Sequence, residues 1–182
     1  MIAPVVKLEA SVQERGPAYH KALECESATR LDTTYFTLAE ALKQAGYATA
    51  HFGKWHLNGK SGPGKPVAKD DPLNPGAFGF QYWFSVSNFF ESNWTFSRNG
   101  EPVATEGDGS DVIVAEALRW IDSGKESSGR PFFAVIWFGN PHGPHKPLAA
   151  DKEAAGGDPE LGEIAGVDRA IQIVERTIEK YG

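Results

Sequence analysis

Apolar residues between Thr37 and Gly46 recur three and four positions apart, which is the spacing of one helix face. The residues of this apolar stripe are Leu38, Ala41, Leu42 and Ala45. Thr37 is suited to cap the helix, and Glu40 lies three residues on, where its carboxylate can reach back to the cap amide. Gly46 supplies the left-handed residue that commonly follows a helix. The pattern therefore predicts a helix that begins after Thr37 and ends before Gly46.

Short apolar runs predict the strands. Residues 47–52 form the first run, and residues 53–56 follow it as a turn at the carboxyl end of the strand. Two further strands are expected over residues 80–84 and 94–97. The run at residues 132–138 is apolar throughout, which is typical of a strand that is covered on both faces.

Turns, a long loop and two more helices complete the predicted elements. The sequence Arg-Asn-Gly-Glu at residues 98–101 is a turn signal, and residues 58–79 have no period and predict a loop. A helix is expected over residues 110–122, and another begins at Asp158 with Pro159 in its first turn. The positions expected to be buried on these two helices are Val114, Ala117, Leu118 and Ile121, and then Leu161, Ile164, Ile171, Val174 and Ile178.

The alternation of helices and strands indicates the α/β class. We expect an α/β sandwich with a mostly parallel or mixed central sheet, flanked by helices and incomplete at both ends. Residues 1–30 have no sustained apolar period and are expected to be a poorly determined lead-in. Residues 31–182 then form the domain, and its sequence stops directly after a helix, where an α/β fold usually adds a strand.

Composition and charge exclude some classes of binding partner. The 182 residues are 41% hydrophobic, which is enough for one domain with a real core. The net charge is -6 with no long basic run, so we expect neither nucleic acid nor a membrane surface as a partner. No signal peptide is predicted, and no apolar stretch approaches the ~20 residues that span a bilayer. The composition indicates neither the oligomeric state nor the cellular location.

A cation and an imidazole stand two residues apart at the end of the first predicted strand, at Lys54 and His56. Ligand sites of open α/β sheets lie outside the carboxyl ends of strands. Lys54 can hold an anionic oxygen, and His56 can position a hydroxyl or carry a proton. Trp55 would point the opposite way and pack. The alternative is a surface lysine beside a structural histidine.

His142 and His145 follow the 132–138 strand in a proline-rich turn, again at a carboxyl end. With Lys54 and His56 they would make half of a site that cleaves an anionic ester. An imidazolium here could protonate a leaving oxygen as the ester bond breaks. Two nearby histidines can also ligate a metal, but Lys146 would repel a cation. Solvated loop histidines are the remaining alternative.

The remaining reactive side chains are expected to have no catalytic or metal-binding role. Cys25 is the only cysteine, so the chain can form no internal disulfide. It lies between Glu24 and Glu26, whose carboxylates disfavour a thiolate nucleophile. The acidic residues beside Gly or Pro are expected to form turns rather than a metal site, and they are Asp70, Asp71 and Asp108.

Residues 37–57 resemble the second signature of the arylsulfatase-type sulfatases, which belong to the alkaline phosphatase superfamily. Residues 131–142 are similar to the later sulfatase segment that ends in a Pro-His pair, and residues 162–169 resemble the helix that follows it. The resemblance covers residues 31–182 in order. It implies a partial sulfatase catalytic domain.

The resemblance implies roles for the candidate residues. Lys54 would bind the sulfate oxygens, and His56 would hydrogen-bond a hydrated formylglycine nucleophile. His142 would contact the sulfate and help to protonate the leaving alcohol, so that Lys54, His142 and His145 form the substrate-binding set. The resemblance also implies calcium, a sulfated small molecule or carbohydrate as substrate, and a protein that is often exported or periplasmic.

The sequence departs from this family at the nucleophile and the metal. The family nucleophile lies in a C/S-x-P-x-R motif upstream of the Thr37 helix, and no such motif occurs here; Cys25 is not followed by a proline. The family's calcium carboxylates and its second active-site lysine fall outside this chain. We therefore expect an internal fragment of the catalytic domain that has no metal ligand and is inactive by itself.

Two alternatives stay open. One is a non-catalytic remnant that binds an anion at Lys54, His56 and His142. The other is a phosphoester or phosphonate hydrolase of the same superfamily, because the same cations suit a phosphoryl group.

Overall fold

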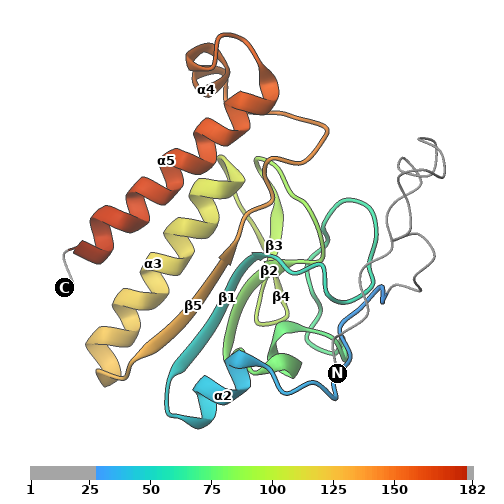
Figure 1. Cartoon of the computed structure of the whole chain (residues 1–182), viewed down its shortest axis with the longest axis vertical. Coiled ribbons are helices and arrows are strands. Elements are labelled where there is room, and N and C mark those ends of the chain that lie inside the picture. Colours follow the sequence, from blue (N-terminus) through green and yellow to red (C-terminus); the bar gives the residue numbers. More distant parts are fainter. Residues whose placement is uncertain (1–27, 180–182) are drawn as a thin grey trace, which may run out of the picture.

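The chain forms a five-stranded sheet with helices on both faces (Figure 1). The computed structural model describes residues 28–179, so Cys25 and nearly all of the expected lead-in lie outside the described residues. The strands are β1 (Ala48–Lys54), β2 (Tyr82–Val86), β3 (Thr95–Arg98), β4 (Glu101–Ala104) and β5 (Phe132–Trp137). The helices are α2 (Leu38–Gln44), α3 (Gly109–Ser128), α4 (Ala149–Ala154), α5 (Pro159–Glu179) and the 3₁₀ helix η3 (Pro75–Phe78).

The strand order is β4-β3-β2-β1-β5, and the sheet is mixed, as predicted. β1 runs parallel to both of its neighbours, β2 and β5. The β2–β3 and β3–β4 pairs are antiparallel. Because β1, β2 and β5 run in the same direction, their carboxyl ends meet at one edge of the sheet, which lies toward the top of Figure 1.

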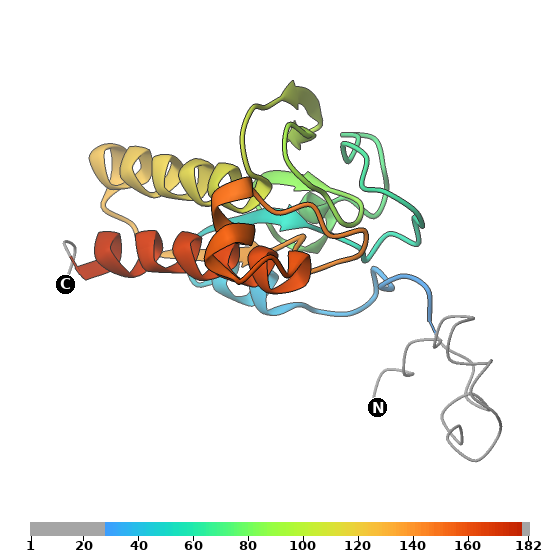
Figure 2. The ribbon, with the colours of Figure 1, turned by 90° about the horizontal axis from the view of Figure 1, so that it is seen from above.

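Two cores lie on opposite faces of the sheet. α3 covers one face and α2 the other, while α5 runs along α3 (Figure 2). The core under α3 is built around Phe52, Phe84 and Ile113. The core on the other face is built around Trp55 and Phe78 and includes Ala39 of α2. This arrangement of helix, sheet and helix is the predicted α/β sandwich.

Helix α2 begins where the sequence predicts. Thr37 Oγ1 accepts a hydrogen bond from the Glu40 N–H at 3.1 Å, and the Glu40 carboxylate accepts one from the Thr37 N–H at 2.7 Å. The predicted apolar stripe is only partly right. Ala41 and Leu42 are half-buried, but Leu38 is 64% exposed and Ala39 is the buried residue. Thr37 Oγ1 also donates to the Phe78 carbonyl at 2.7 Å. This bond and the burial of Ala39 against Phe78 orient the helix, overriding its own periodicity.

Strand β5 corrects a second prediction. Its apolar sequence predicted a strand covered on both faces, but its residues are only half-buried, and Phe132 and Trp137 are exposed. The reason is its position, because β5 is the edge strand next to β1. Ala134 and Ile136 pack toward the core under α3, and Phe133 and Val135 pack toward the other.

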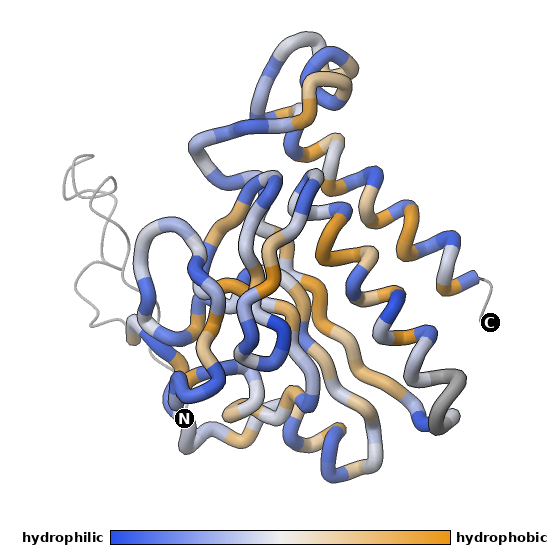
Figure 3. Tube along the Cα trace, turned by 180° about the vertical axis from the view of Figure 1, so that it is seen from behind, coloured by the Kyte–Doolittle hydropathy of each residue, from blue (hydrophilic) through white to orange (hydrophobic). Residues whose placement is uncertain are grey.

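The buried face of α5 also differs from the prediction. Figure 3 shows hydrophobic residues recurring along this helix, yet Leu161, Ile164, Ile171 and Ile178 are all exposed. The buried residues recur every four positions, at Gly162, Gly166 and Ala170, and Glu163 is buried with them. Small side chains allow α5 to approach α3 and α4 closely, so size rather than hydropathy selects the packed face.

Smaller differences concern element limits. β1 extends to Lys54, so Gly53 and Lys54 belong to the strand rather than to the predicted turn. α3 extends beyond the predicted helix to Ser128, and α4 was not predicted. The turn at residues 98–101 is confirmed, with Asn99 and Gly100 both at positive φ between β3 and β4.

Candidate functional site

Lys54 is the last residue of β1, and β5 ends at Trp137 one strand away. In the β1–β5 pairing Gly53 stands opposite Trp137, so the segments after both strands emerge at the same level. The Lys54–His56 segment and the loop after β5 therefore share the carboxyl edge of the parallel strands. This edge is where ligand sites of open α/β sheets lie.

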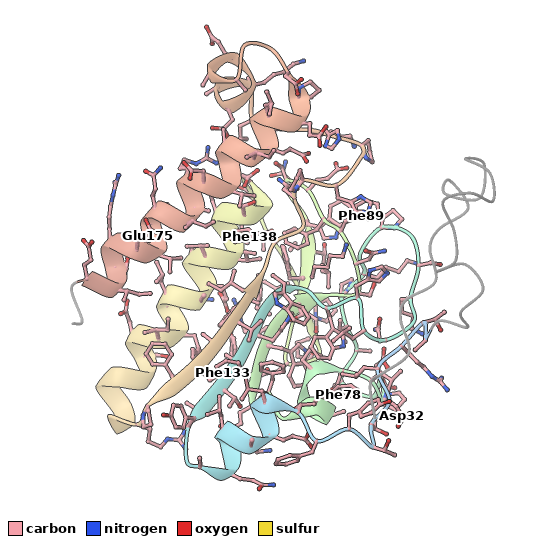
Figure 4. All side chains as sticks on the ribbon, viewed as in Figure 1. Asp32, Phe78, Phe89, Phe133, Phe138 and Glu175 are labelled. Atoms are coloured by element: carbon pink, nitrogen blue, oxygen red, sulfur yellow. The ribbon has the colours of Figure 1, made fainter. Side chains whose placement is uncertain are left out.

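An open cavity of about 470 Å³ lies at this edge. Its lining comes from the ends of β1 and β5 and consists of Lys54, Trp55, His56, Leu57, Ile136, Trp137 and Phe138. Figure 4 labels Phe138 directly above the end of β5. The cavity joins one cation and one imidazole to an aromatic wall, which suits an anionic group carried on an apolar body.

The main chain after β1 fixes how these side chains are presented. The Trp55 and His56 N–H groups donate to the Val86 and Ser87 carbonyls at 2.8 and 3.0 Å. Trp55 is buried, as predicted, and its indole N–H donates to the Leu73 carbonyl at 2.7 Å. His56 is exposed and has a φ of 31°, an uncommon conformation for a residue other than glycine. Lys54 and His56 thus flank a rigidly packed tryptophan.

The loop after β5, residues 139–146, is named here the histidine loop. The His142 ring stacks on Phe89 at a centroid distance of 4.1 Å, and its Nδ1–H donates to the Gly143 carbonyl at 2.7 Å. Phe89 belongs to the segment after β2 (Figure 4), so His142 bridges two of the three parallel-strand ends. Neither His142 nor His145 is among the residues that line the cavity.

Glu163 on α5 holds the other side of the histidine loop. It accepts hydrogen bonds from the Lys146 N–H at 2.7 Å and the His142 N–H at 3.3 Å. Its Oε2 also lies 3.1 Å from His145 Nδ1. The hydrogen bond to Glu163 raises the pKa of His145 above its usual value. Sequence reasoning did not single out Glu163, because a glutamate in the first turns of a helix usually faces water.

His51, a second residue that sequence reasoning missed, lies under the cavity. His51 of β1 is fully buried, and its Nδ1 shares a 2.7 Å hydrogen bond with the Ser85 hydroxyl. Its ring meets those of Trp55 and Trp137 edge-on at 4.9 Å, and burial lowers its pKa to about 3. His51 is therefore a neutral packing residue. Its place in the middle of an apolar run was the sequence signal that could have predicted its burial.

Two of the acidic residues considered as metal ligands, Asp71 and Asp108, have structural contacts. Asp71 accepts from the Asn58 side chain and the Leu73 N–H, at 3.0 and 2.9 Å. Asp108 caps α3 by accepting from the Ser110 N–H at 2.9 Å. Within residues 28–179 no group of three or more His, Cys, Asp or Glu side chains could hold a metal ion, so these residues do not fit a calcium centre. Among the same residues, no helix is long and apolar enough to cross a membrane.

Comparison with known proteins identifies the family. The sequence model described as Sulfatase matches residues 8–181. An ulvan-active sulfatase of Formosa agariphila is 28% identical over 111 residues, which cover 59% of this chain and 20% of that protein. The chain thus spans about a fifth of the length of this curated relative.

Solved structures share the fold at low sequence identity. A Bacteroides thetaiotaomicron protein connected with the metabolism of multiple glycosaminoglycans matches with a TM-score of 0.69 and 18% identity, over 85% of this chain and 40% of its own. The protein Ps i-CgsB, solved in complex with k-i-k-neocarrahexaose, matches with a TM-score of 0.70 and 17% identity, over 85% of this chain and 39% of its own. At these identities the likeness is one of fold.

Proposed function

Because the chain belongs to the sulfatase family, we propose that it forms the sulfate-binding edge of a hydrolase of sulfate esters, an edge made by Lys54, His56 and His142. The observation that carries the proposal is the meeting of two cationic segments at the carboxyl ends of the parallel strands β1 and β5. The chain spans only part of its relatives, so the reaction is a proposal for the whole protein.

Lys54 is the group suited to a sulfate oxygen. It is a half-buried cation at the mouth of a cavity that is also lined by aromatic and aliphatic side chains. An ion pair is worth more in such a partly desolvated place than in open water. A lysine there would stabilise the oxygens of the sulfuryl group as charge builds up on them.

The histidines are suited to move protons. Hydrolysis breaks the bond between sulfur and the ester oxygen, forms a bond from sulfur to the attacking oxygen, and leaves an alkoxide that needs a proton. His142 uses Nδ1–H on the Gly143 carbonyl, so Nε2 is the atom that would give this proton. His56 would orient the attacking hydroxyl.

The nucleophile and calcium that the family implies find no support in the described residues. No metal-ligating cluster occurs between residues 28 and 179, and the chain contains no C/S-x-P-x-R motif. We therefore assign no step to either group, and we expect the isolated chain to bind sulfate without hydrolysing its esters.

A sulfated carbohydrate is the proposed ligand class. The Trp137 indole is 42% exposed and lines the cavity beside Phe138, so it offers an apolar surface next to Lys54. A sugar ring has an apolar face that can pack on an indole while its sulfate meets the cation. Ps i-CgsB was solved with a bound oligosaccharide, which agrees with this class.

Non-catalytic anion binding is the second candidate function. The specific observation in its favour is that the cationic edge is present while the described residues hold no metal cluster. In this case the whole protein would bind sulfated ligands and release them unchanged.

Calorimetric titration with sodium sulfate tests the proposal, with phosphate and chloride titrated in parallel. Lys54→Ala should weaken sulfate binding roughly ten- to a hundredfold, the worth of one charged hydrogen bond. The matched control is Lys60→Ala, an exposed lysine of the following loop, which should bind sulfate like the parent. Equal affinity in all three proteins would overturn the proposal, and a preference for phosphate would favour phosphoester chemistry.

A further inference from the structure

Glu163 is a buried carboxylate whose oxygens face the histidine loop. Its side chain is 1% exposed, and such a group is costly to bury unless it is paired and hydrogen-bonded. Oε1 accepts from the Lys146 N–H, and Oε2 faces both the His142 N–H and His145 Nδ1. All three of these contacts go to one loop of the site.

The packing of α5 places Glu163 there. A Cβ on Gly162 would lie 2.9 Å from Pro147 Cγ and 3.0 Å from Lys152 Cα, so the helix touches the segment that follows the histidine loop. Two turns further on, Arg169 pairs with Asp111 of α3 at 2.9 Å and with Asp151 of α4. These contacts fix α5 from two sides, and so they fix the carboxylate relative to β5 and its loop.

Within residues 28–179, His145 is the basic side chain that pairs with Glu163. Lys146 Nζ pairs with Glu91 at 2.8 Å instead. Glu160 and Asp158, near the start of α5, also act on His145 and favour its protonated form. With Nδ1 directed at Glu163, the ring nitrogen that remains for another partner is Nε2.

We propose that Glu163 is the positioning residue of the histidine loop: it ties down the main chain at His142 and Lys146, and it keeps a proton on Nδ1 of His145. A carboxylate behind an imidazole orients the ring and settles its tautomer, as in other carboxylate–histidine pairs. His145 then presents Nε2, and His142 keeps its place on Phe89. The consequence for sulfate binding rests on the proposed function, whereas the effect on the loop does not.

The test is ¹⁵N NMR of the histidine rings with Glu163→Gln. A carboxamide offers one acceptor oxygen where the carboxylate offers two, and its NH₂ would face an N–H donor. We expect the His145 pKa to fall toward its ordinary value, its neutral form to lose the preference for the Nδ1–H tautomer, and the affinity for sulfate to fall about tenfold. Glu175→Gln is the matched control, an exposed glutamate farther along α5 (Figure 4), and it should change none of these.

An unchanged His145 pKa and tautomer in a folded Glu163→Gln protein would overturn the inference. If that variant does not fold, the parent protein still decides: a neutral His145 that carries its proton on Nε2, or a pKa at or below the ordinary value, would refute it. Failure of the proposed function looks different. The parent would then not bind sulfate, while the ring nitrogens would still respond to Glu163→Gln.

Discussion

Gly53 of β1 packs directly against the main-chain carbonyl of Trp137 in β5, so closely that a Cβ at position 53 would overlap the Trp137 oxygen. Gly53 also has a φ of 94°, in the region that favours glycine. The two residues stand opposite each other in the strand pairing. This contact lies immediately before Lys54, so it sets the spacing of the two strands where the cavity begins.

Gly53→Ala should therefore destabilise the protein severely. The left-handed backbone costs a side chain about 1–2 kcal/mol, and forcing a methyl against a neighbouring main chain adds roughly 1–3 kcal/mol. Gly46→Ala is the matched control, because Gly46 has a φ of 90° but nothing lies within 4 Å of its added Cβ. Urea denaturation should show the larger loss at position 53. Equal losses would mean that the close approach to Trp137 is unimportant.

Thr37→Ala should cost about 1–2 kcal/mol of unfolding free energy. The hydroxyl accepts a hydrogen bond from the Glu40 N–H and donates one to the Phe78 carbonyl. Its loss therefore removes a hydrogen-bond partner from a group on α2 and from a group on η3. Thr37→Ser keeps the hydroxyl and should recover most of the stability. The melting temperatures of the three proteins measure this. A serine variant as unstable as the alanine variant would assign the effect to the lost methyl group instead.

His51 should make stability depend on pH. Its pKa is about 3 when folded, against an ordinary 6.5, because burial disfavours the charged ring. Below pH 6.5 the unfolded chain binds a proton that the folded chain does not, so stability falls as the pH drops from 6.5 toward 3, by up to about 1.4 kcal/mol per pH unit.

The parent and His51→Phe should be compared by urea denaturation between pH 7 and pH 4. Phenylalanine does not titrate, so His51→Phe should lose less stability than the parent as the pH falls. His145 acts in the opposite direction, because its raised pKa stabilises the fold at low pH and this contribution is lost as the pH rises through the folded value. It is present in both proteins and cancels. Parallel pH profiles would contradict a buried, neutral His51.

Features with local causes were predictable from the sequence. The cap at Thr37, the left-handed Gly46 and the Asn99-Gly100 turn depend on a few adjacent residues, and all three are as predicted. The choice of Lys54 and His56 also followed from sequence, because strand ends and motif residues can be recognised in one segment. Their position on one cavity agrees with that choice, while their roles stay predictions.

Features set by distant contacts were not predictable. The apolar sequence of β5 does not reveal that it is an edge strand, and the periodicity of α5 does not reveal that Gly162 and Gly166 form its packed side. Glu163 was missed for the same reason. Its partners lie 17 to 21 residues away and meet it only once α5 has packed against α3 and α4.

Sulfate is proposed to bind at the carboxyl edge of β1 and β5. The most direct measurement is a sulfate titration of the ¹⁵N-labelled chain, followed through its backbone amides and histidine rings at constant ionic strength. We expect saturable shifts at Lys54, His56 and His142, and none at Lys60 or Glu175, which lie elsewhere on the surface. Uniform small shifts, or no shift at these three residues at high sulfate, would contradict it.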